Sequence, residues 1–395
     1  MMSDTSDSYD CIIVGGGPGG ASAAIHLATK GARVLLIEQK KFPREKLCGE
    51  FISPECLEHF RHLGVAESMG VAGGVNVTET RFYSRKGASI SVPSQWFGQS
   101  ETLALGLSRA EMDERLLRRA SAVGVQVIEG ARVNALLMEE GRVCGVRVKA
   151  GAAAREYSAR VTIDATGRSR ALSRVVEQPS HHGRAPFVAF KTHVSGACSD
   201  AGCCEIYSFP GGYGGLVPVE GGLSNLCFIV SSRDARVRRG DAEKVVREIV
   251  MTNQRARRTL ERARARTEWL GTALEGFGRR EITPAEGLLA VGDAASFIDP
   301  FTGSGMLMAL ESGELAARVV ARWLDATGGA TARLAELMKE YRALYGTAFG
   351  ARLRVCSMLR RAVFIPRLAD AVIFTLGTSA SVRRRLARST RPQFS

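Results

Sequence analysis

The feature that most restricts the fold is the stretch at residues 9–38, YDCIIVGGGPGGASAAIHLATKGARVLLIE. An apolar strand runs into a glycine-rich turn, an Ala-rich helix follows, and a second apolar strand ends at Glu38. In the turn, Gly15 suits a tight bend, Gly17 lets a pyrophosphate approach the backbone, and Gly20 allows close helix–strand packing. Glu38 stands where a carboxylate can bind ribose hydroxyls. This order predicts a Rossmann-like α/β domain that binds a dinucleotide, without distinguishing NAD from FAD.

Length and cysteine usage narrow the class of protein. A chain of 395 residues can bury a large core and is expected to form two domains. Its nine cysteines are odd in number and form no CxxC pair, which favours a reducing compartment and predicts no metal site. The N-terminus lacks the apolar region of a signal peptide, and no apolar run is long enough to span a membrane. We therefore expect a cytoplasmic location.

The net charge of +14 comes mainly from arginines spread along the chain, with concentrations at 233–239, 255–265 and 383–391. No zinc spacing, homeodomain-like helix or aromatic RNA-binding signature accompanies them, so nucleic acid is not an expected partner. A solvated surface, an acidic partner or an anionic membrane surface explains the charge more economically.

Downstream patterns alternate between strands and helices. Residues 108–124 predict a helix, with Ser108 and Glu111 forming a capping box and Gly124 ending it. The remaining expected elements are a helix at 54–63, short strands within 74–100, a small β-meander at 125–129, 131–139, 142–149 and 157–164, strands between 185 and 232, a helical segment at 242–266, and helices from 304 and over 331–349.

Two later blocks carry further glycine-rich turns. Residues 161–170 read VTIDATGRSR, a strand whose end holds Asp164 and Gly167. Residues 291–306 read VGDAASFIDPFTGSGM, in which a strand stops near Asp293 and a turn leads into a helix. The start of that helix exposes backbone N–H groups and a positive dipole end, which favour an anion or a polarisable acceptor. Taken alone, Asp293 could equally cap a helix.

Together the three blocks resemble the FAD-binding architecture of the p-hydroxybenzoate-hydroxylase-like flavoproteins. That superfamily includes aromatic monooxygenases, geranylgeranyl reductases and flavin-dependent halogenases. The resemblance implies an α/β fold with a Rossmann-like FAD-binding domain of the glutathione-reductase type, an inserted β-sheet substrate domain and C-terminal helices. The implied boundaries are 1–75, 101–178 and 279–330 for the FAD-binding domain, 76–100 and 179–278 for the substrate domain, and 331–395 for the C-terminal helical segment.

The same resemblance assigns roles to individual residues. Asp293 would bind the ribityl region, and Arg109 the phosphate or ribose region. The turn from Pro300 to Met306 would lie along the flavin ring, with the helix start facing the N1–C2=O edge, where reduced flavin gathers negative charge. The implied cofactor-binding set is Gly15, Gly17, Pro18, Gly20, Glu38, Arg44, Arg109, Val133, Asp164, Gly167, Asp293, Pro300, Gly303, Gly305 and Met306.

Two catalytic candidates lie on the substrate side. Cys48, in KKFPREKLCGEF at 40–51, stands in a segment similar to that of geranylgeranyl-reductase-like members, where a Cys lies near the flavin ring. A small buried apolar residue is the alternative reading. Tyr213 lies in GGYGGLVPV at 211–219, where the family often has G-(Y/W)-x-W-x-(F/I)-P. Gly215 stands at the position of the second Trp, which weakens the case for halogenation. A glycine there would also open space for a bulky ligand. A plain β-hairpin with a glycine-rich turn is the alternative reading of these residues.

We expect an FAD-dependent monooxygenase that hydroxylates or epoxidises a hydrophobic aromatic, polyketide-like or isoprenoid molecule through a flavin C4a-hydroperoxide. Since no second nucleotide fingerprint is present, NAD(P)H would bind transiently as the reductant, or a separate reductase would supply the electrons. The alternative is a geranylgeranyl-reductase-like enzyme that reduces C=C bonds; a halogenase or a non-catalytic flavin carrier has less support. The basic segment at 354–391 is expected to be a helical lid, or else to contact a membrane surface or an acidic carrier protein.

Overall fold

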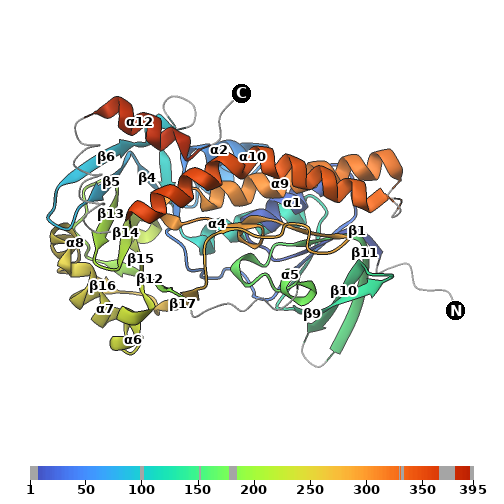
Figure 1. Ribbon diagram of the computed structural model, residues 1–395, viewed down its shortest axis with the longest axis horizontal. Coiled ribbons are helices and arrows are strands. Elements are labelled where there is room, and N and C mark those ends of the chain that lie inside the picture. Colours follow the sequence, from blue (N-terminus) through green and yellow to red (C-terminus); the bar gives the residue numbers. More distant parts are fainter. Residues whose placement is uncertain are drawn as a thin grey trace.

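The computed structural model describes residues 8–97, 102–150, 153–177, 185–328, 330, 333–363 and 379–391. A β-sheet lies at each end of the molecule, and two long helices, α9 (Gly305–Thr327) and α10 (Leu334–Val363), run side by side along one side of it (Figure 1). None of the described helices combines the length and the apolar run needed to cross a bilayer. The predicted helix at 331–349 is present, apart from residues 331–332, which lie outside the described residues, and it extends further than expected.

The first sheet is Rossmann-like and confirms the predicted fold class. Its parallel part has the order β8-β2-β1-β11, with β19 pairing to the far side of β11. The amino-terminal half of the long strand β11 leaves β1 and forms an antiparallel meander with β10 and β9. We expected residues 125–129 in the meander, but β8 pairs with β2 at the sheet edge because helix α4 carries the chain back there. The bounds are β1 (Ser8–Val14), β2 (Val34–Glu38), α4 (Arg109–Ala122), β8 (Gln126–Glu129), β9 (Arg132–Glu139), β10 (Arg142–Ala150), β11 (Ala153–Asp164) and β19 (Leu288–Ala290).

Helix α1 (Pro18–Ala28) packs against α9 at very short range. A Cβ built on Gly313 would lie 2.2 Å from the Gly19 carbonyl oxygen, so only glycine fits at that crossing. The Ser22 hydroxyl donates to the Leu310 carbonyl at 2.9 Å. Residues nearly 300 positions apart in the chain therefore form one packed layer under the first sheet.

Helix α4 begins as predicted, because the Ser108 hydroxyl accepts the Glu111 N–H at 3.2 Å. The return bond of a capping box is not made. The Ser108 N–H donates instead to Glu220 at 3.0 Å, and Glu111 pairs with Arg115. The neighbouring helices are α2 (Pro54–His62), which confirms the prediction at 54–63, and α3 (Ala66–Gly70).

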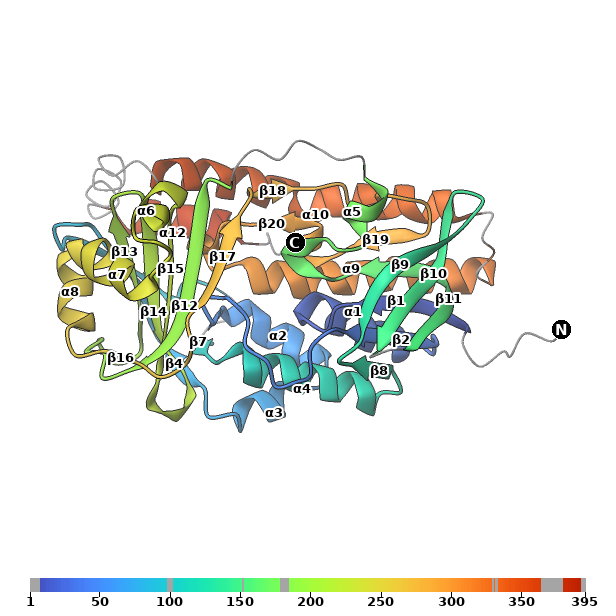
Figure 2. The same cartoon turned by 90° about the horizontal axis from the view of Figure 1, so that it is seen from below.

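The second sheet has eight strands in the order β16-β12-β15-β14-β13-β5-β6, with β17 also pairing to β12 (Figures 1 and 2). Alternate side chains point to opposite faces of each strand. Tyr207 packs with the helices α6–α8, whereas its neighbour Ile206 faces a cavity. The bounds are β5 (Glu79–Tyr83), β6 (Ser89–Pro93), β12 (Phe187–Ser195), β13 (Cys203–Phe209), β14 (Gly212–Pro218), β15 (Ser224–Ser231), α6 (Ser232–Val237), α7 (Ala242–Glu248), α8 (Gln254–Leu260), β16 (Arg264–Ala265) and β17 (Leu270–Leu274).

The predicted helical segment at 242–266 is wrong as a single unit. Asn253 divides it into α7 and α8, because its side-chain oxygen accepts the N–H groups of Arg255 and Ala256 and starts a new helix. The amide nitrogen of Asn253 also donates to the Ser84 and Ser208 carbonyls at 3.0 Å each, which fixes the break against the second sheet. The last residues of the segment pair as strand β16.

Short elements join the two sheets. A three-stranded sheet contains β3 (Phe51–Ile52), β7 (Ala104–Gly106) and β4 (Val75–Val77), and a two-stranded one contains β18 (Gly278–Arg279) and β20 (Ser296–Phe297). Helix α5 (Ser173–Val176) follows β11, and α12 (Ala380–Ser389) lies over β6. The remainder of the predicted lid, residues 364–378, falls outside the described residues. We keep the predicted domain boundaries as a proposed division of the chain.

Candidate functional site

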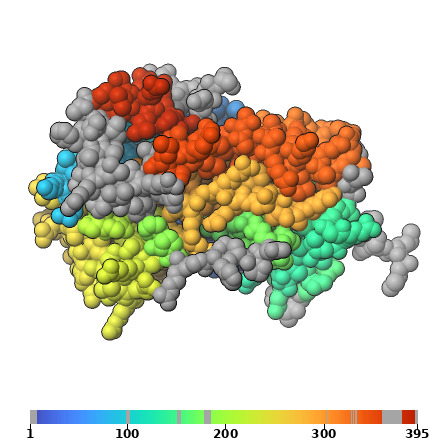
Figure 3. Space-filling view, viewed as in Figure 1, coloured from blue at the N-terminus to red at the C-terminus, as the bar shows by residue number. Residues whose placement is uncertain are grey.

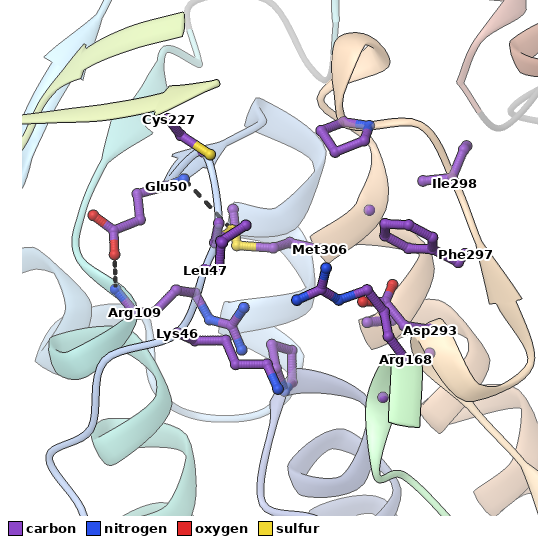
Figure 4. A pocket seen from close by; sticks show the side chains of 18 of the residues that line it. Lys46, Leu47, Glu50, Arg109, Arg168, Cys227, Asp293, Phe297, Ile298 and Met306 are labelled. Carbon is purple, nitrogen blue, oxygen red and sulfur yellow. Dashed lines mark hydrogen bonds between the residues drawn. The ribbon is translucent and has the colours of Figure 1, made fainter. Parts of the chain in front are cut away.

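A cavity of about 600 Å³ lies between the two sheets. Residues from every block singled out in the sequence line it, and Figure 4 shows part of its wall. Of the predicted site residues, those in the lining are Gly15, Gly17, Pro18, Glu38, Arg44, Cys48, Arg109, Val133, Gly167, Tyr213, Asp293, Pro300, Gly303, Gly305 and Met306. Gly20 and Asp164 are not in the lining.

The geometry of the first glycine-rich turn accounts for its glycines. Gly15 has φ +111°, and a Cβ built there would lie 2.3 Å from the Ala165 carbonyl oxygen. A Cβ on Gly20 would lie 1.9 Å from the Gly15 carbonyl oxygen, so Gly20 acts through packing beneath the turn. A Cβ on Gly17 would meet no atom closer than the Arg109 guanidinium at 3.7 Å. Gly17 therefore faces open space beside a cation, which fits a pyrophosphate.

Two guanidinium groups share one buried carboxylate beside this turn. Arg109 donates to both oxygens of Asp113, at 2.8 and 2.6 Å, and Arg44 forms an ion pair with the same carboxylate at 3.0 Å. Asp113 is fully buried. Arg44 also forms an ion pair with Glu38 at 3.7 Å, so two carboxylates balance the two guanidinium groups. Guanidinium nitrogens of both arginines still lie beside Gly17, where they could donate hydrogen bonds to an anion.

Glu38 and Asp164 hold backbone turns. The Glu38 oxygens accept the N–H groups of Gly16 and Lys40, each at 2.9 Å, while the residue also faces the cavity. Asp164 accepts four hydrogen bonds, two from Thr166 and two from Ser173, and is fully buried. Asp164 thus fixes the loop after β11, and it does not reach the cavity lining.

Asp293, Lys46 and Arg168 form a second polar group on the wall (Figure 4). Among the described residues, Asp293 and Lys46 have no hydrogen-bond or ion-pair partner. Burial raises the pKa of Asp293 although Arg168 and Lys46 oppose it, and burial together with Arg109 lowers the pKa of Lys46. Half-buried charged groups without protein partners are typical of a polar ligand site. With the Gly17 cradle and its cations, these residues fit FAD.

The turn before α9 is held from the second sheet. The Asp299 carboxylate accepts the Phe301 N–H at 3.0 Å and a hydrogen bond from the Tyr213 hydroxyl, which itself accepts the Phe301 N–H at 3.0 Å. Burial and the neighbouring Asp299 raise the pKa of Tyr213 well above its ordinary value, so the phenol stays protonated. Gly303 then takes φ +61° and α9 starts at Gly305. Tyr213 is thereby a positioning residue for this turn.

Cys48 lies on the wall between the two sheets. Its sulfur accepts the Glu50 N–H at 3.5 Å, and its carbonyl accepts the Asn225 side-chain amide at 2.9 Å. Cys227 lines the same cavity, and burial raises its pKa to about 12. The Cys48 segment is therefore attached directly to strand β15 of the second sheet.

A buried charge cluster was missed in the sequence. Glu50 accepts hydrogen bonds from the Arg109 N–H at 2.9 Å (Figure 4), from Lys191 Nζ at 2.6 Å and from His193 Nε2 at 2.6 Å. Burial alone would raise the pKa of Glu50, but His193 and Lys191 outweigh it and lower the pKa. Lys191 also contacts Glu45. Glu45, Glu50 and His193 could together hold a metal ion, but the Lys191 ammonium already supplies a positive charge between the two carboxylates.

The other end of the cavity is apolar. A Cβ built on Gly215 would lie 2.9 Å from Ile206 Cδ1, so Ile206 takes part of the space expected above that glycine. The inner face of α12 crosses this end with Arg383, Leu386 and Ala387. The apolar wall consists of Phe82, Ile90, Val92, Phe97, Ile206 and Val217.

Comparison with known proteins gives consistent matches. A family model described as an FAD binding domain matches residues 8–343. The chain is 28% identical over 363 residues to digeranylgeranylglycerophospholipid reductase 1 of Methanococcoides burtonii, covering 88% of this chain and 83% of that protein. It is 26% identical over 340 residues to a 1H-pyrrole-2-carbonyl-(peptidyl-carrier protein) brominase of Pseudoalteromonas luteoviolacea, covering 80% and 78%.

Among solved structures, a geranylgeranyl bacteriochlorophyll reductase-like protein of Thermoplasma acidophilum superposes with a TM-score of 0.80. The two chains are 22% identical, and the match covers 97% of this chain and 96% of the other. At that identity the likeness concerns the fold alone.

Proposed function

The chain belongs to the FAD binding domain family, and on this premise we propose that it reduces a carbon–carbon double bond of an extended apolar molecule. At the coarser level it is an FAD-dependent oxidoreductase. The proposed reaction adds two electrons and two protons across the double bond. Electrons would enter from an external reductant such as NAD(P)H, and FAD, when bound, supplies two-electron transfer at its ring.

The observation that carries the proposal is the continuity of the cavity. The cradle at Gly17, the Cys48 segment and the apolar wall of the second sheet all line one space. A cofactor bound at the cradle and an apolar chain bound at the wall would therefore meet near Cys48. The relative that is a digeranylgeranylglycerophospholipid reductase supports an isoprenoid-like chain as the substrate class.

The residues of the chain have separate tasks in this proposal. Arg44 and Arg109 would bind the pyrophosphate, and Asp293 the ribityl hydroxyls. The turn held by Tyr213 and Asp299 would place the start of α9 against the ring, where its N–H groups stabilise negative charge. The apolar wall would exclude water and orient the chain. Cys48, which lines the cavity at this wall, would move a proton there.

Product mass and oxygen dependence test this reaction. Holoenzyme reduced with dithionite under argon is mixed with geranylgeraniol. We expect the flavin absorbance near 450 nm to return and the product to gain two mass units. Two results together would contradict reduction and support oxygenation. The flavin absorbance would fail to return under argon, and the product formed in ordinary air would gain sixteen mass units.

Oxygenation is the second candidate. The same apolar wall, closed by α12, would shield the ring from water, as an oxygen-inserting reaction requires. Incorporation of one ¹⁸O atom from ¹⁸O₂ would establish it. Halogenation has less support, because Gly215 stands where halogenases carry the second Trp. The brominase relative acts on a carrier-protein-bound pyrrole, and an acidic carrier or a membrane surface as partner of this chain stays a proposal.

A further inference from the structure

Arg391 brings a buried positive charge to the substrate end of the cavity. It follows α12, beyond the residues that the family model matches. Residues 383, 386, 387, 390 and 391 recur at helical spacing and line the cavity, while Arg384, Arg385 and Arg388 are exposed on the opposite face. Figure 3 shows α12 on the surface at the end of the molecule that holds the second sheet. The inner face of α12 therefore lines the cavity, and its outer face is exposed to solvent.

Among the residues that the structure describes, few groups satisfy the Arg391 guanidinium. The side chain is only 7% exposed, yet it carries five N–H donors. Its polar contacts to described residues are a hydrogen bond from Nη1 to the Gly303 carbonyl at 3.5 Å and an ion pair from Nε to Glu55 at 3.5 Å. Both lie at the long limit for such contacts. Most of its donor capacity is left for a ligand.

The surroundings hold this charge in one place. The guanidinium lies over the Phe97 ring at 4.5 Å from the centroid, a cation–π contact that fixes its plane. Glu55 is 4% exposed, and neither of its oxygens accepts a hydrogen bond in the described part of the chain. A buried charge with such loose pairing is costly to the fold. A planar fork held beside an apolar wall is suited to bidentate contact with an oxyanion.

We propose that Arg391 is the anion-binding group of the substrate cavity and that the substrate is an apolar chain carrying an oxyanion, either a carboxylate or a phosphate. Gly303, in the turn assigned to the flavin ring, lies directly beside Arg391. Anchoring the oxyanion there would fix the distance from the charged group to the reacting bond. The substrate class rests on the proposed function, whereas oxyanion binding by Arg391 stands without it.

The test measures binding to the holoenzyme with three matched probes: geranic acid, geranyl phosphate and geraniol. Affinity is measured by calorimetry and by perturbation of the flavin spectrum. We expect at least one anionic probe to bind about tenfold or more tightly than the alcohol, a difference of about 1.4 kcal/mol, since only the anions can make a charge-assisted bidentate contact. Which anion binds distinguishes a carboxylate from a phosphate substrate. Arg391→Gln should abolish the preference, and Arg391→Lys should keep part of it.

Arg384→Gln, on the outer face of the same helix, is the matched control and should leave all three affinities unchanged. Equal binding of the anions and the alcohol to the wild type would overturn the proposal, and this comparison stands even where Arg391→Gln does not fold. An R391Q variant that shifts the midpoint potential of the ligand-free flavin, with unchanged probe affinities, would show instead that Arg391 serves the cofactor. Tight anion binding without reduction would count against the proposed reaction alone.

Discussion

Replacing Lys191 with Met should destabilise the protein through an uncompensated buried charge. Lys191 is 1% exposed, and its ammonium group bonds Glu50, which is fully buried. Removing one partner of a buried ion pair costs about 3 kcal/mol or more. An unfolding entropy of roughly 2.1 cal/mol/K per residue gives about 0.8 kcal/mol/K for 395 residues, so the midpoint should fall by about 4 °C.

The assay is thermal denaturation of FAD-saturated protein, followed by circular dichroism. Lys339→Met, at an exposed position of α10 with no ion pair to a described residue, is the matched control and should change the midpoint by less than about 1 °C. The double variant K191M/E50Q should lose less than the sum of its single variants, because removing both charges removes the mismatch. Additive losses, or no loss in K191M, would refute the reasoning.

Acid pH supplies an independent check. The pKa of Glu50 is lowered in the folded state, so its ionised form contributes stability above the ordinary carboxyl pKa. That contribution is lost as the pH falls through the lowered value. In K191M the Glu50 carboxylate has lost a cationic partner and is easier to protonate, and protonation removes the uncompensated buried charge. The difference between wild type and K191M should therefore shrink between pH 7 and pH 4; a constant difference would contradict an electrostatic origin.

Three further predictions concern the cofactor site. Gly20→Ala would place a Cβ 1.9 Å from the Gly15 carbonyl oxygen and should abolish FAD retention, read from the 450/280 nm absorbance ratio, whereas Gly70→Ala, whose Cβ meets nothing within 4 Å, should retain it. Asp293→Asn should weaken FAD binding to deflavinated protein by about tenfold or more in a fluorescence titration, since a charged hydrogen bond is worth about 1.5–3 kcal/mol; unchanged affinity would remove Asp293 from the site. Tyr213→Phe should lower the thermal midpoint by a few degrees through loss of the bond to buried Asp299, about equally at pH 7 and pH 9 because the pKa of Tyr213 is raised well above its ordinary value; a loss confined to pH 9 would contradict this.

The residues that could be predicted from the sequence are those with a local pattern. The roles of Gly15 and Gly20 could be predicted because a tight turn and a close helix–strand contact require glycines at a fixed spacing within one short motif. The helix start at Ser108 could also be predicted, because the N-cap and its partner Glu111 lie within four consecutive residues. Its missing return bond could not, because the competing partner, Glu220, lies 112 residues away.

The charge cluster around Glu50 had no local signal. Its bonds to Lys191 and His193 span 141 and 143 residues. In the CGE segment the sequence favours Cys48 as a catalytic candidate, although the Glu50 carboxylate two residues later holds the segment in place. The inner face of α12 differs in this respect. The sequence predicts a helical lid for this segment, and residues 383, 386, 387, 390 and 391 follow a helical repeat, but the repeat does not show which face lines the cavity.

The crossing of α1 and α9 has a consequence for synthesis on the ribosome. Gly19 emerges early, but the backbone that it touches at Gly313 follows nearly 300 residues later. At roughly 5–20 residues per second, the nascent chain waits about 15–60 s before the first helix can find its partner. For about the first half of that interval, until β11 emerges, the apolar edge of β1 is open to mispairing. Translation rate and chaperone supply, rather than equilibrium stability, should therefore set the yield of correctly assembled protein.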